Sequence, residues 1–316
     1  MKPLVIYHAN CADGFGAAFA AWLKFGNEAE YFPMQYGAGT TVADLNSLYP
    51  SLRDYEIYIL DFSLPKTEMD WLFDNAKRVV WLDHHKTAFE MWCGEYYPGK
   101  RYTQPLVSTS SSLADRPEKN TVILDDTKSG AMLAWEYFHP GKEIPMLIKH
   151  IDDYDRWQFK LEGTKEFNKA LWSYAPWSFE QWKNWVFSMS IVDLLKAEGA
   201  AILRAHEQNV QSVVKGSAKR CRITGKGLLG SFNYGETGLA ANCPSHLASD
   251  VGHELANQSG TYGLLWYINK DGKCSCSLRS NGDYDVSAIA KSFGGGGHKN
   301  AAGFETDIQT LLGWIK

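Results

Sequence analysis

The chain has 316 residues, of which 45% are hydrophobic and 22% are charged, and its net charge at pH 7 is −4. This length and apolar content allow two buried cores. The mild negative charge excludes a general basic field that would attract long nucleic acid or a membrane surface. The first residues enter an apolar run with no signal-peptide pattern, and no apolar run is long enough to span a bilayer. We therefore expect a cytoplasmic protein without membrane contact.

Strand-like apolar runs alternate with helix-like stretches through the first half of the chain, which predicts a doubly wound, mostly parallel α/β sheet. Strands are expected at residues 4–8, 57–60 and 78–82, and helices at residues 17–24 and 129–138. The polar segment 100–128 is rich in Ser, Thr and charged residues and is expected to be an irregular excursion.

A long helix is predicted over residues 191–215, where apolar residues recur at helical spacing. We expect a catalytic domain over residues 1–188, a linker helix over 189–216 and a smaller α/β substrate-binding domain over 217–316. In this last domain the sequence predicts strands at 262–269 and 274–279 and a helix at 286–293.

The six cysteines are expected to be free thiols in a reducing cytosol. Cys274-Ser275-Cys276 lacks the spacing of a zinc ribbon, and its alternation predicts a strand with both sulfur atoms on one face. Four tryptophans crowd the stretch before the predicted long helix, and we favour a core or domain interface over base stacking for them. They are Trp172, Trp177, Trp182 and Trp185.

Acidic residues and histidines follow several of the strand-like runs. Asp61 follows the run 57–60, and Asp83-His84-His85 closes the run 78–82. Because parallel strands bring their carboxyl ends to one crevice, these side chains should meet there. One such residue alone would more often have a structural role, but several segments together favour a metal site. Histidine with carboxylate suits Mn²⁺ or a related ion better than thiolate-binding metals.

A glycine-rich motif, residues 293–304, lies near the C-terminus and contains His298. Glycines allow a phosphate to approach the backbone closely, although an isolated glycine run would more often be a flexible turn. Arg279 precedes the motif and offers a planar fork suited to phosphate, whereas a lone Arg after a strand is more often solvated.

In order and placement, these motifs resemble the DHH phosphoesterase family with its associated C-terminal domain, which includes nanoRNases, single-strand exonucleases and cyclic-dinucleotide phosphodiesterases. The resemblance spans nearly the whole chain. It implies a two-domain enzyme with a di-metal centre that holds two Mn²⁺ ions, with Mg²⁺ or Co²⁺ as alternatives.

The resemblance also implies a role for each matching residue. Asp61 would bridge the two ions, with His8 on one ion and Asp13, His84 and Asp153 around the other. His85 would face the phosphate, and Asp83 would orient His84. The catalytic set would be His85, Asp83 and Asp61. Asn10, Asp83 and Asp155 are further candidates for the metal site. The substrate-binding set would be Arg279, Ser280, Gly295, Gly296, Gly297 and His298.

The first motif departs from the family, because Cys11 stands where an aspartate is common and the nearest polar group is Asn10. One ion is therefore expected to be held more loosely. Asn10 has a carbonyl oxygen and Cys11 a sulfur that would suit an ion, but neither follows from the family pattern.

We expect a metal-dependent phosphodiesterase that hydrolyses very short RNA or linear dinucleotides to mononucleotides by two-metal activation of water. One alternative is a phosphatase acting on polyphosphate, pyrophosphate or 3′-phosphonucleotides. Another, of a different class, is a non-catalytic nucleotide-binding sensor.

Overall fold

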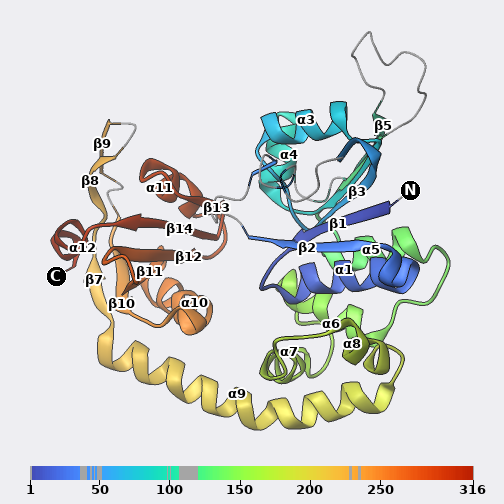
Figure 1. The fold of residues 1–316 in the computed structure, drawn as a ribbon. Helices are drawn as coiled ribbons and strands as arrows, with labels where there is room; N and C mark the ends of the chain where they lie inside the picture. Colours follow the sequence, from blue (N-terminus) through green and yellow to red (C-terminus); the bar gives the residue numbers. More distant parts are fainter. Residues whose placement is uncertain are drawn as a thin grey trace. The chain divides into compact units, whose positions relative to one another are not determined.

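The computed structural model describes residues 2–35, 41–42, 45, 47, 52–97, 99, 101–106, 120–227, 230–233 and 236–315. The chain divides into two compact units, Met1–Ile202 and Leu203–Lys316. Each unit contains a six-stranded sheet with helices packed against it (Figure 1). Within the described ranges, every helix is too short or too polar to cross a membrane.

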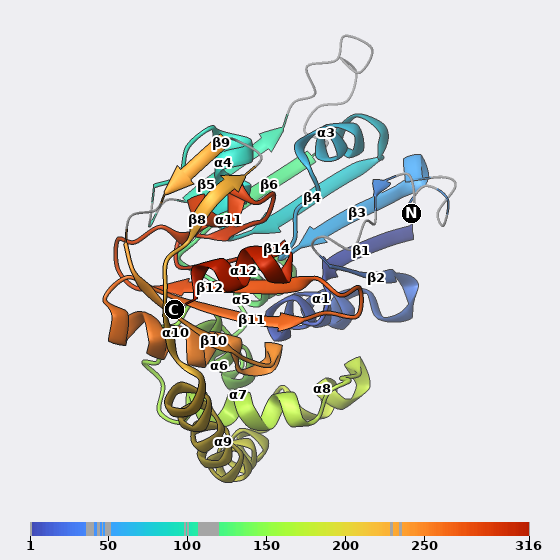
Figure 2. The ribbon, with the colours of Figure 1, turned by 90° about the vertical axis from the view of Figure 1, so that its left-hand side faces the viewer.

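The first sheet has the strand order β2-β1-β3-β4-β6-β5, and Figure 2 shows these strands side by side. All neighbours pair in parallel except β5, which lies antiparallel to β6 at the edge. This arrangement confirms the predicted mostly parallel sheet. The strands are β1 (Lys2–His8), β2 (Glu30–Met34), β3 (Tyr55–Leu60), β4 (Arg78–Asp83), β5 (Arg101–Leu106) and β6 (Asn120–Asp125).

The expected irregular excursion over residues 100–128 is wrong for the two ends of that segment, which form β5 and β6. The β6 sequence Asn-Thr-Val-Ile-Leu-Asp has a β-branched apolar centre, which favours a strand once it pairs with β4. The polar residues around it concealed that signal. Residues 107–119 lie outside the described part of the chain.

Helices cover both faces of the first sheet. Successive side chains of a strand point to opposite faces, so β4 places Val80 and Leu82 in one core and Val79 and Trp81 in the other. The first core is closed by α1 (Ala12–Phe25) and α5 (Gly130–Phe138), and the second by α3 (Lys66–Asn75) and α4 (Lys86–Cys93). Figure 1 shows these pairs on opposite sides of the strands. The sheet is therefore doubly wound, as predicted.

The helices that follow α5 extend the first core. They are α6 (Met146–Asp155), α7 (Thr164–Ser173), α8 (Phe179–Trp185) and the long α9 (Met189–Ser217). Trp182 is fully buried, and Trp177 and Trp185 pack against the same core. Trp182 therefore lies in the interior of the first unit and Trp177 and Trp185 are partly buried against it, whereas Trp172 is exposed, at 42%.

The second unit is a smaller mixed sheet of order β13-β14-β12-β11-β10-β7, with helices on both faces. Helix α10 (Ala248–Ser259) and the end of α9 pack on one face, and α11 (Val286–Ser292) and α12 (Ile308–Trp314) on the other. Its strands are β7 (Lys219–Cys221), β10 (Gly238–Asn242), β11 (Tyr262–Ile268), β12 (Cys274–Ser280), β13 (Gly296–His298) and β14 (Ala301–Thr306). A separate hairpin joins β8 (Thr224–Gly227) to β9 (Gly230–Asn233).

The predicted α/β character of the second unit is confirmed, with a strand at each predicted place and the predicted helix before the glycine-rich motif. Cys274 and Cys276 are both buried on one face of β12, as their alternation predicted. The described residues also include short 3-10 helices at Gly26–Glu28, Leu52–Asp54 and Ser245–Leu247.

Candidate metal centre

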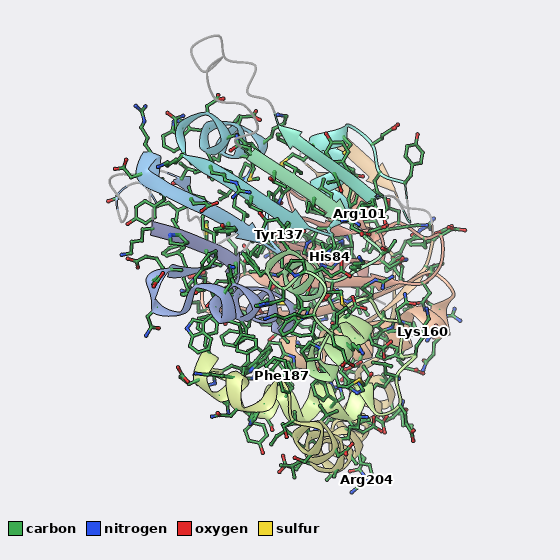
Figure 3. All side chains as sticks on the ribbon, turned by 90° about the vertical axis from the view of Figure 1, so that its right-hand side faces the viewer. His84, Arg101, Tyr137, Lys160, Phe187 and Arg204 are labelled. Carbon is green, nitrogen blue, oxygen red and sulfur yellow. The ribbon has the colours of Figure 1, made fainter. Side chains whose placement is uncertain are left out.

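Three neighbouring parallel strands end in candidate metal ligands. Strand β1 ends at His8, Asp61 follows β3 directly, and β4 is followed by His84 and His85. The carboxyl ends of parallel strands lie along one edge of the sheet, which is where doubly wound folds bind ligands. Figure 3 labels His84 at this edge, where the arrows of the first sheet end.

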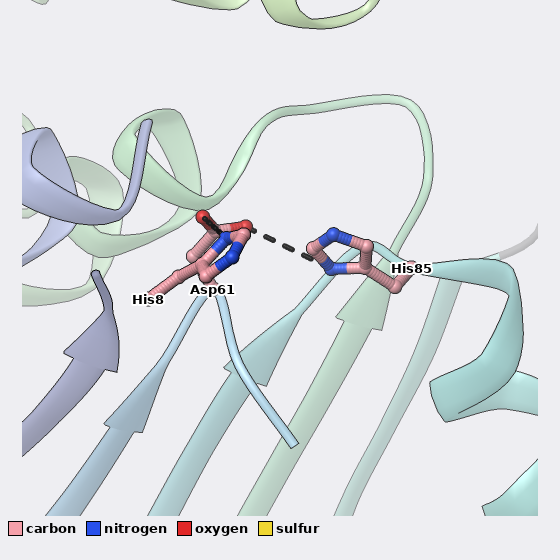
Figure 4. Close-up of side chains that lie close together, drawn as sticks. All are labelled: His8, Asp61 and His85. Carbon is pink, nitrogen blue, oxygen red and sulfur yellow. Dashed lines mark ion pairs between the residues drawn. The ribbon is translucent and has the colours of Figure 1, made fainter. Parts of the chain in front are cut away.

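His8, Asp61 and His85 form one group, in which a donor atom of each residue lies within 4.8 Å of those of the others. Asp61 is the shared partner, because its Oδ2 lies 3.5 Å from His8 Nδ1 and its Oδ1 lies 3.8 Å from His85 Nδ1. Figure 4 shows the two imidazoles turned toward the Asp61 carboxylate.

Asp13, His84 and Asp155 form a second group of the same kind. His84 Nε2 lies 3.5 Å from Asp13 Oδ2 and 3.6 Å from Asp155 Oδ2. The same nitrogen lies 3.1 Å from Asp61 Oδ1. The two groups are therefore adjacent, and Asp61 contacts members of both.

The residues present fit a divalent cation. Asp61 Oδ2 is buried and has no hydrogen-bond partner within the described part of the chain. A buried carboxylate oxygen left in that state is costly, and a bound cation would compensate it. The donor set consists of imidazole nitrogens and carboxylate oxygens, which suits Mn²⁺ and similar ions.

The residues of the two groups shift one another's pKa values. Burial alone would raise the pKa of Asp61, but the nearby imidazoles of His8, His84 and His85 hold that pKa far below its ordinary value. Burial alone would lower the pKa of His84, but Asp61, Asp155 and Asp13 together raise it well above its usual range. An arriving cation would therefore displace protons, as is general for sites of this composition.

The backbone at Asp61 is left-handed, with φ of +54°. Aspartate tolerates this region better than most residues, and such conformations concentrate at functional sites. Gly130 packs closely against Asp61, because a Cβ added to Gly130 would lie 2.4 Å from Asp61 Cβ. Glycine at 130 thus lets the first turn of α5 approach the site.

The same turn of α5 holds Asp13. The Asp13 carboxylate accepts hydrogen bonds from the backbone N–H groups of Gly130 (2.7 Å) and Ala131 (2.8 Å). Both belong to the N–H groups that a helix N-terminus leaves without intrahelical partners. The sequence analysis missed Gly130, and only its position directly after the N-cap Ser129 gave a signal for this contact.

Asp153, which was expected beside Asp13 and His84, lies in neither group, and Asp155 lies beside those two residues instead. The Asp153 carboxylate accepts hydrogen bonds from the backbone N–H groups of Lys160 (2.8 Å) and Leu161 (3.0 Å) and from the Thr164 hydroxyl (2.7 Å). Residues two apart on a helix do not share a face. Helix α6 therefore turns one of these carboxylates toward His84 and the other toward the turn after it.

Asp83 orients His85 and not the ring of His84. Its Oδ1 lies 2.7 Å from His85 Nδ1 and accepts hydrogen bonds from the backbone N–H groups of His84 and His85. A carboxylate on one nitrogen of an imidazole fixes the tautomer and the orientation of the ring. Asn10 is exposed, donates to Gln35 Oε1 at 3.3 Å and lies in neither group.

The expected substrate-binding residues divide into two kinds. Ser280 is buried, and its hydroxyl donates to Tyr284 O and accepts from Asn300 Nδ2, so its side chain serves the interior of the second unit. Arg279 is partly buried and donates to Ser249 Oγ and to Leu278 O. His298 is exposed at the end of β13.

The glycine run packs β13 against β14. A Cβ at Gly295 would lie 2.1 Å from Gly303 O, and one at Gly297 would lie 2.5 Å from Ala301 O. A Cβ at Gly296 would meet nothing within 4 Å. Two of the three glycines thus have a packing reason that is independent of any phosphate.

We expect His150 to make the free energy of unfolding depend on pH. Its buried ring donates from Nδ1 to Thr164 Oγ1 (2.8 Å), because that hydroxyl itself donates to Asp153, and its Nε2 has no partner in the described residues. Burial, followed by the charge of Lys196, lowers the pKa of His150 to about 4. The folded pKa lies below the unfolded value of about 6.5, so this stabilisation is complete above pH 6.5 and is lost as the pH falls toward 4.

We expect the free energy of unfolding to fall by about 2 to 3 kcal/mol over that range through His150. Urea denaturation at several pH values should reveal this fall, and a His150→Asn variant should show a shallower one. Equal slopes for the two proteins would refute the assignment.

The chain is similar to several known proteins. The DHHA1 domain model matches residues 244–311. An uncharacterized protein of Acanthamoeba polyphaga mimivirus is 28% identical over 312 residues, which cover 95% of this chain and 66% of that protein. Oligoribonuclease NrnB of Bacillus subtilis is 21% identical over 306 residues, which cover 94% of this chain and 71% of NrnB. The chain thus spans about two thirds of the length of these relatives.

Among solved structures, the pGpG-specific phosphodiesterase PggH of Vibrio cholerae is 12% identical, with a TM-score of 0.47 over 99% of this chain and 95% of that one. The DHHA1 match lies within the second unit, and the likeness to NrnB extends over nearly the whole chain. These findings support a DHH-family protein, with a DHHA1 domain in the second unit.

Proposed function

We propose that this protein is a Mn²⁺-dependent phosphodiesterase that hydrolyses very short RNA or linear dinucleotides to mononucleotides. The observation that carries the proposal is the pair of adjacent His and carboxylate groups that meet at Asp61. The likeness to NrnB, which is named an oligoribonuclease, supports a short RNA substrate.

Each residue of the site has a part in the proposed reaction. When bound, two divalent ions supply an activated water and neutralise charge on the phosphate. Asp61 would hold both ions, with His8 and His85 on one side and Asp13, His84 and Asp155 on the other. Asp83 would keep the His85 ring in place, and the first turn of α5 would keep Asp13 in place.

A substrate screen tests the proposal. Purified protein with Mn²⁺ is offered linear dinucleotides, longer RNA, pyrophosphate, polyphosphate and 3′-phosphonucleotides, with EDTA-treated protein as the control. We expect dinucleotides and very short RNA to give the highest kcat/KM and EDTA to abolish turnover. Preference for pyrophosphate or 3′-phosphonucleotides would replace the proposal with a phosphatase, and binding without turnover would replace it with a nucleotide sensor.

We further propose that Arg279 and His298 hold a substrate phosphate. Arg279→Ala and His298→Ala should each lower kcat/KM for dinucleotides by roughly ten- to a hundredfold, the equivalent of one lost charge-assisted hydrogen bond. Mn²⁺ affinity should not change. Arg220→Ala, which removes an exposed arginine from β7 at the other edge of the same sheet, is the matched control. Dinucleotide kinetics equal to those of the control would remove both residues from the substrate site.

Cys11 should leave one ion weakly held. Burial, together with the charges of Asp61, Asp155 and Asp13, raises the pKa of the Cys11 thiol well above its usual value, and a neutral thiol is a poor metal ligand. Isothermal titration with Mn²⁺ should therefore show two unequal sites, and Cys11→Asp should tighten the weaker one. Two equally tight sites in the unmodified protein would contradict this expectation.

A further inference from the structure

Three aromatic side chains gather where α6 ends. Tyr154 lies in the last turn of the helix, and Trp157 and Phe159 lie in the turn that follows. The ring centroids are 5.6 Å apart for Tyr154 and Trp157, 5.8 Å for Tyr154 and Phe159, and 4.8 Å for Trp157 and Phe159. Trp157 is 41% exposed. We call these three residues the aromatic trio.

The turn has an unusual backbone. Trp157 has φ of +56° and Phe159 has φ of +50°. Bulky side chains rarely adopt this left-handed region, because their Cβ approaches the following carbonyl oxygen. Two such residues within three positions mark a conformation that the rest of the structure must impose.

Asp153 imposes it. Its carboxylate accepts from the backbone N–H groups of Lys160 and Leu161, and its carbonyl oxygen accepts from the N–H of Gln158 at 2.9 Å. These bonds close the turn around Trp157 and Phe159. The Asp153 side chain therefore builds the turn that presents Trp157.

The aromatic trio adjoins the second metal group. Asp155 belongs to that group and stands between Tyr154 and Trp157 in the chain. Two residues span at most about 7 Å between Cα atoms. Trp157, which is 41% exposed, is thus held in a fixed backbone conformation with its Cα atom within about 7 Å of that of Asp155, a candidate metal ligand.

We propose that Trp157, backed by Phe159, is a stacking platform for a nucleobase of the substrate. This inference rests on the proposed function and deepens it, because it requires a substrate with a base beside the cleaved phosphodiester. An aromatic face accepts every base, since each base has a π-face. The platform therefore selects nucleotides over pyrophosphate and polyphosphate with little preference among bases.

The test compares three variants. Trp157→Gly removes the ring, and glycine adopts φ of +56° without strain, so the turn is preserved. Trp157→Phe keeps an aromatic face. Trp172→Ala removes a tryptophan of nearly the same exposure, 42%, from α7 and is the matched control.

Two measurements are made on each protein. The first is kcat/KM for a dinucleotide and for an abasic analogue that keeps the sugars and the phosphodiester. The second is binding of a slowly hydrolysed phosphorothioate dinucleotide that carries 2-aminopurine, whose fluorescence is quenched on stacking.

We expect Trp157→Gly to lose the quenching and to lower kcat/KM for the dinucleotide by roughly 5- to 150-fold, with a much smaller loss for the abasic analogue. Trp157→Phe should recover most of both signals, and Trp172→Ala should behave as the unmodified protein does. Equal losses for the two substrates, or unchanged quenching in Trp157→Gly, would overturn the platform. If the unmodified protein hydrolyses neither substrate, the proposed function fails, and the quenching alone still decides on the platform.

Discussion

Replacement of Asp61 by alanine should reduce dinucleotide hydrolysis by more than about a thousandfold, beyond the loss typical of removing a single electrostatic group. Asp61 contacts His8 and His85 in one group and His84 in the other, so its loss removes the carboxylate that both groups share. Steady-state kinetics with Mn²⁺, with metal content measured on the same sample, gives the result.

A second variant separates charge from backbone strain at this position. Alanine is disfavoured at φ of +54°, whereas asparagine tolerates that region and has the shape of aspartate. Asp61→Asn should therefore melt near the unmodified protein and still be inactive. Near-normal turnover by either variant, when folded and metal-loaded, would refute the shared role of Asp61.

Asp155 and Asp153 should give opposite phenotypes when each is replaced by asparagine. Asp155→Asn removes a charge from the group with Asp13 and His84, so it should weaken one Mn²⁺ site and lower kcat by about a hundredfold while stability changes little. Asp153→Asn weakens the hydrogen bonds to Lys160, Leu161 and Thr164, so it should cost about 2 to 3 kcal/mol of stability.

Mn²⁺ titration and urea denaturation of both variants provide the comparison. Each variant is the control for the other, because the two substitutions have the same chemistry and are two positions apart on α6. If Asp153→Asn loses the metal and Asp155→Asn loses stability, the assignment of these two residues is reversed.

The sequence predicted those parts of the site that follow from strand periodicity. Asp61 and His84 directly follow apolar runs, and parallel strands bring such positions together whatever the loops do. Which of Asp153 and Asp155 faces the site depends on how α6 is rotated about its axis. The sequence of the acidic cluster does not determine that rotation. The role of Asp83 similarly depends on a ring orientation that the tripeptide Asp83-His84-His85 leaves open.

The local backbone geometry at the glycine-rich motif and after α6 could not be predicted from the sequence. The glycine run before His298 was interpreted through phosphate binding, whereas Gly295 and Gly297 are packed against β14. The sequence shows that aromatic residues follow the acidic cluster. It does not show that Trp157 and Phe159 have left-handed backbone conformations, because residue types of this kind rarely adopt them. By contrast, the doubly wound sheet was predictable from the alternation of apolar runs and helices, because few other folds accommodate that alternation.

The most direct test of the two-ion centre is anomalous X-ray scattering from crystals of this protein soaked in Mn²⁺. The account predicts two anomalous peaks in each chain, one beside His8 and His85 and one beside Asp13, His84 and Asp155, with Asp61 touching both. A single peak, no peak at these residues, or a peak beside Asp153 would contradict it.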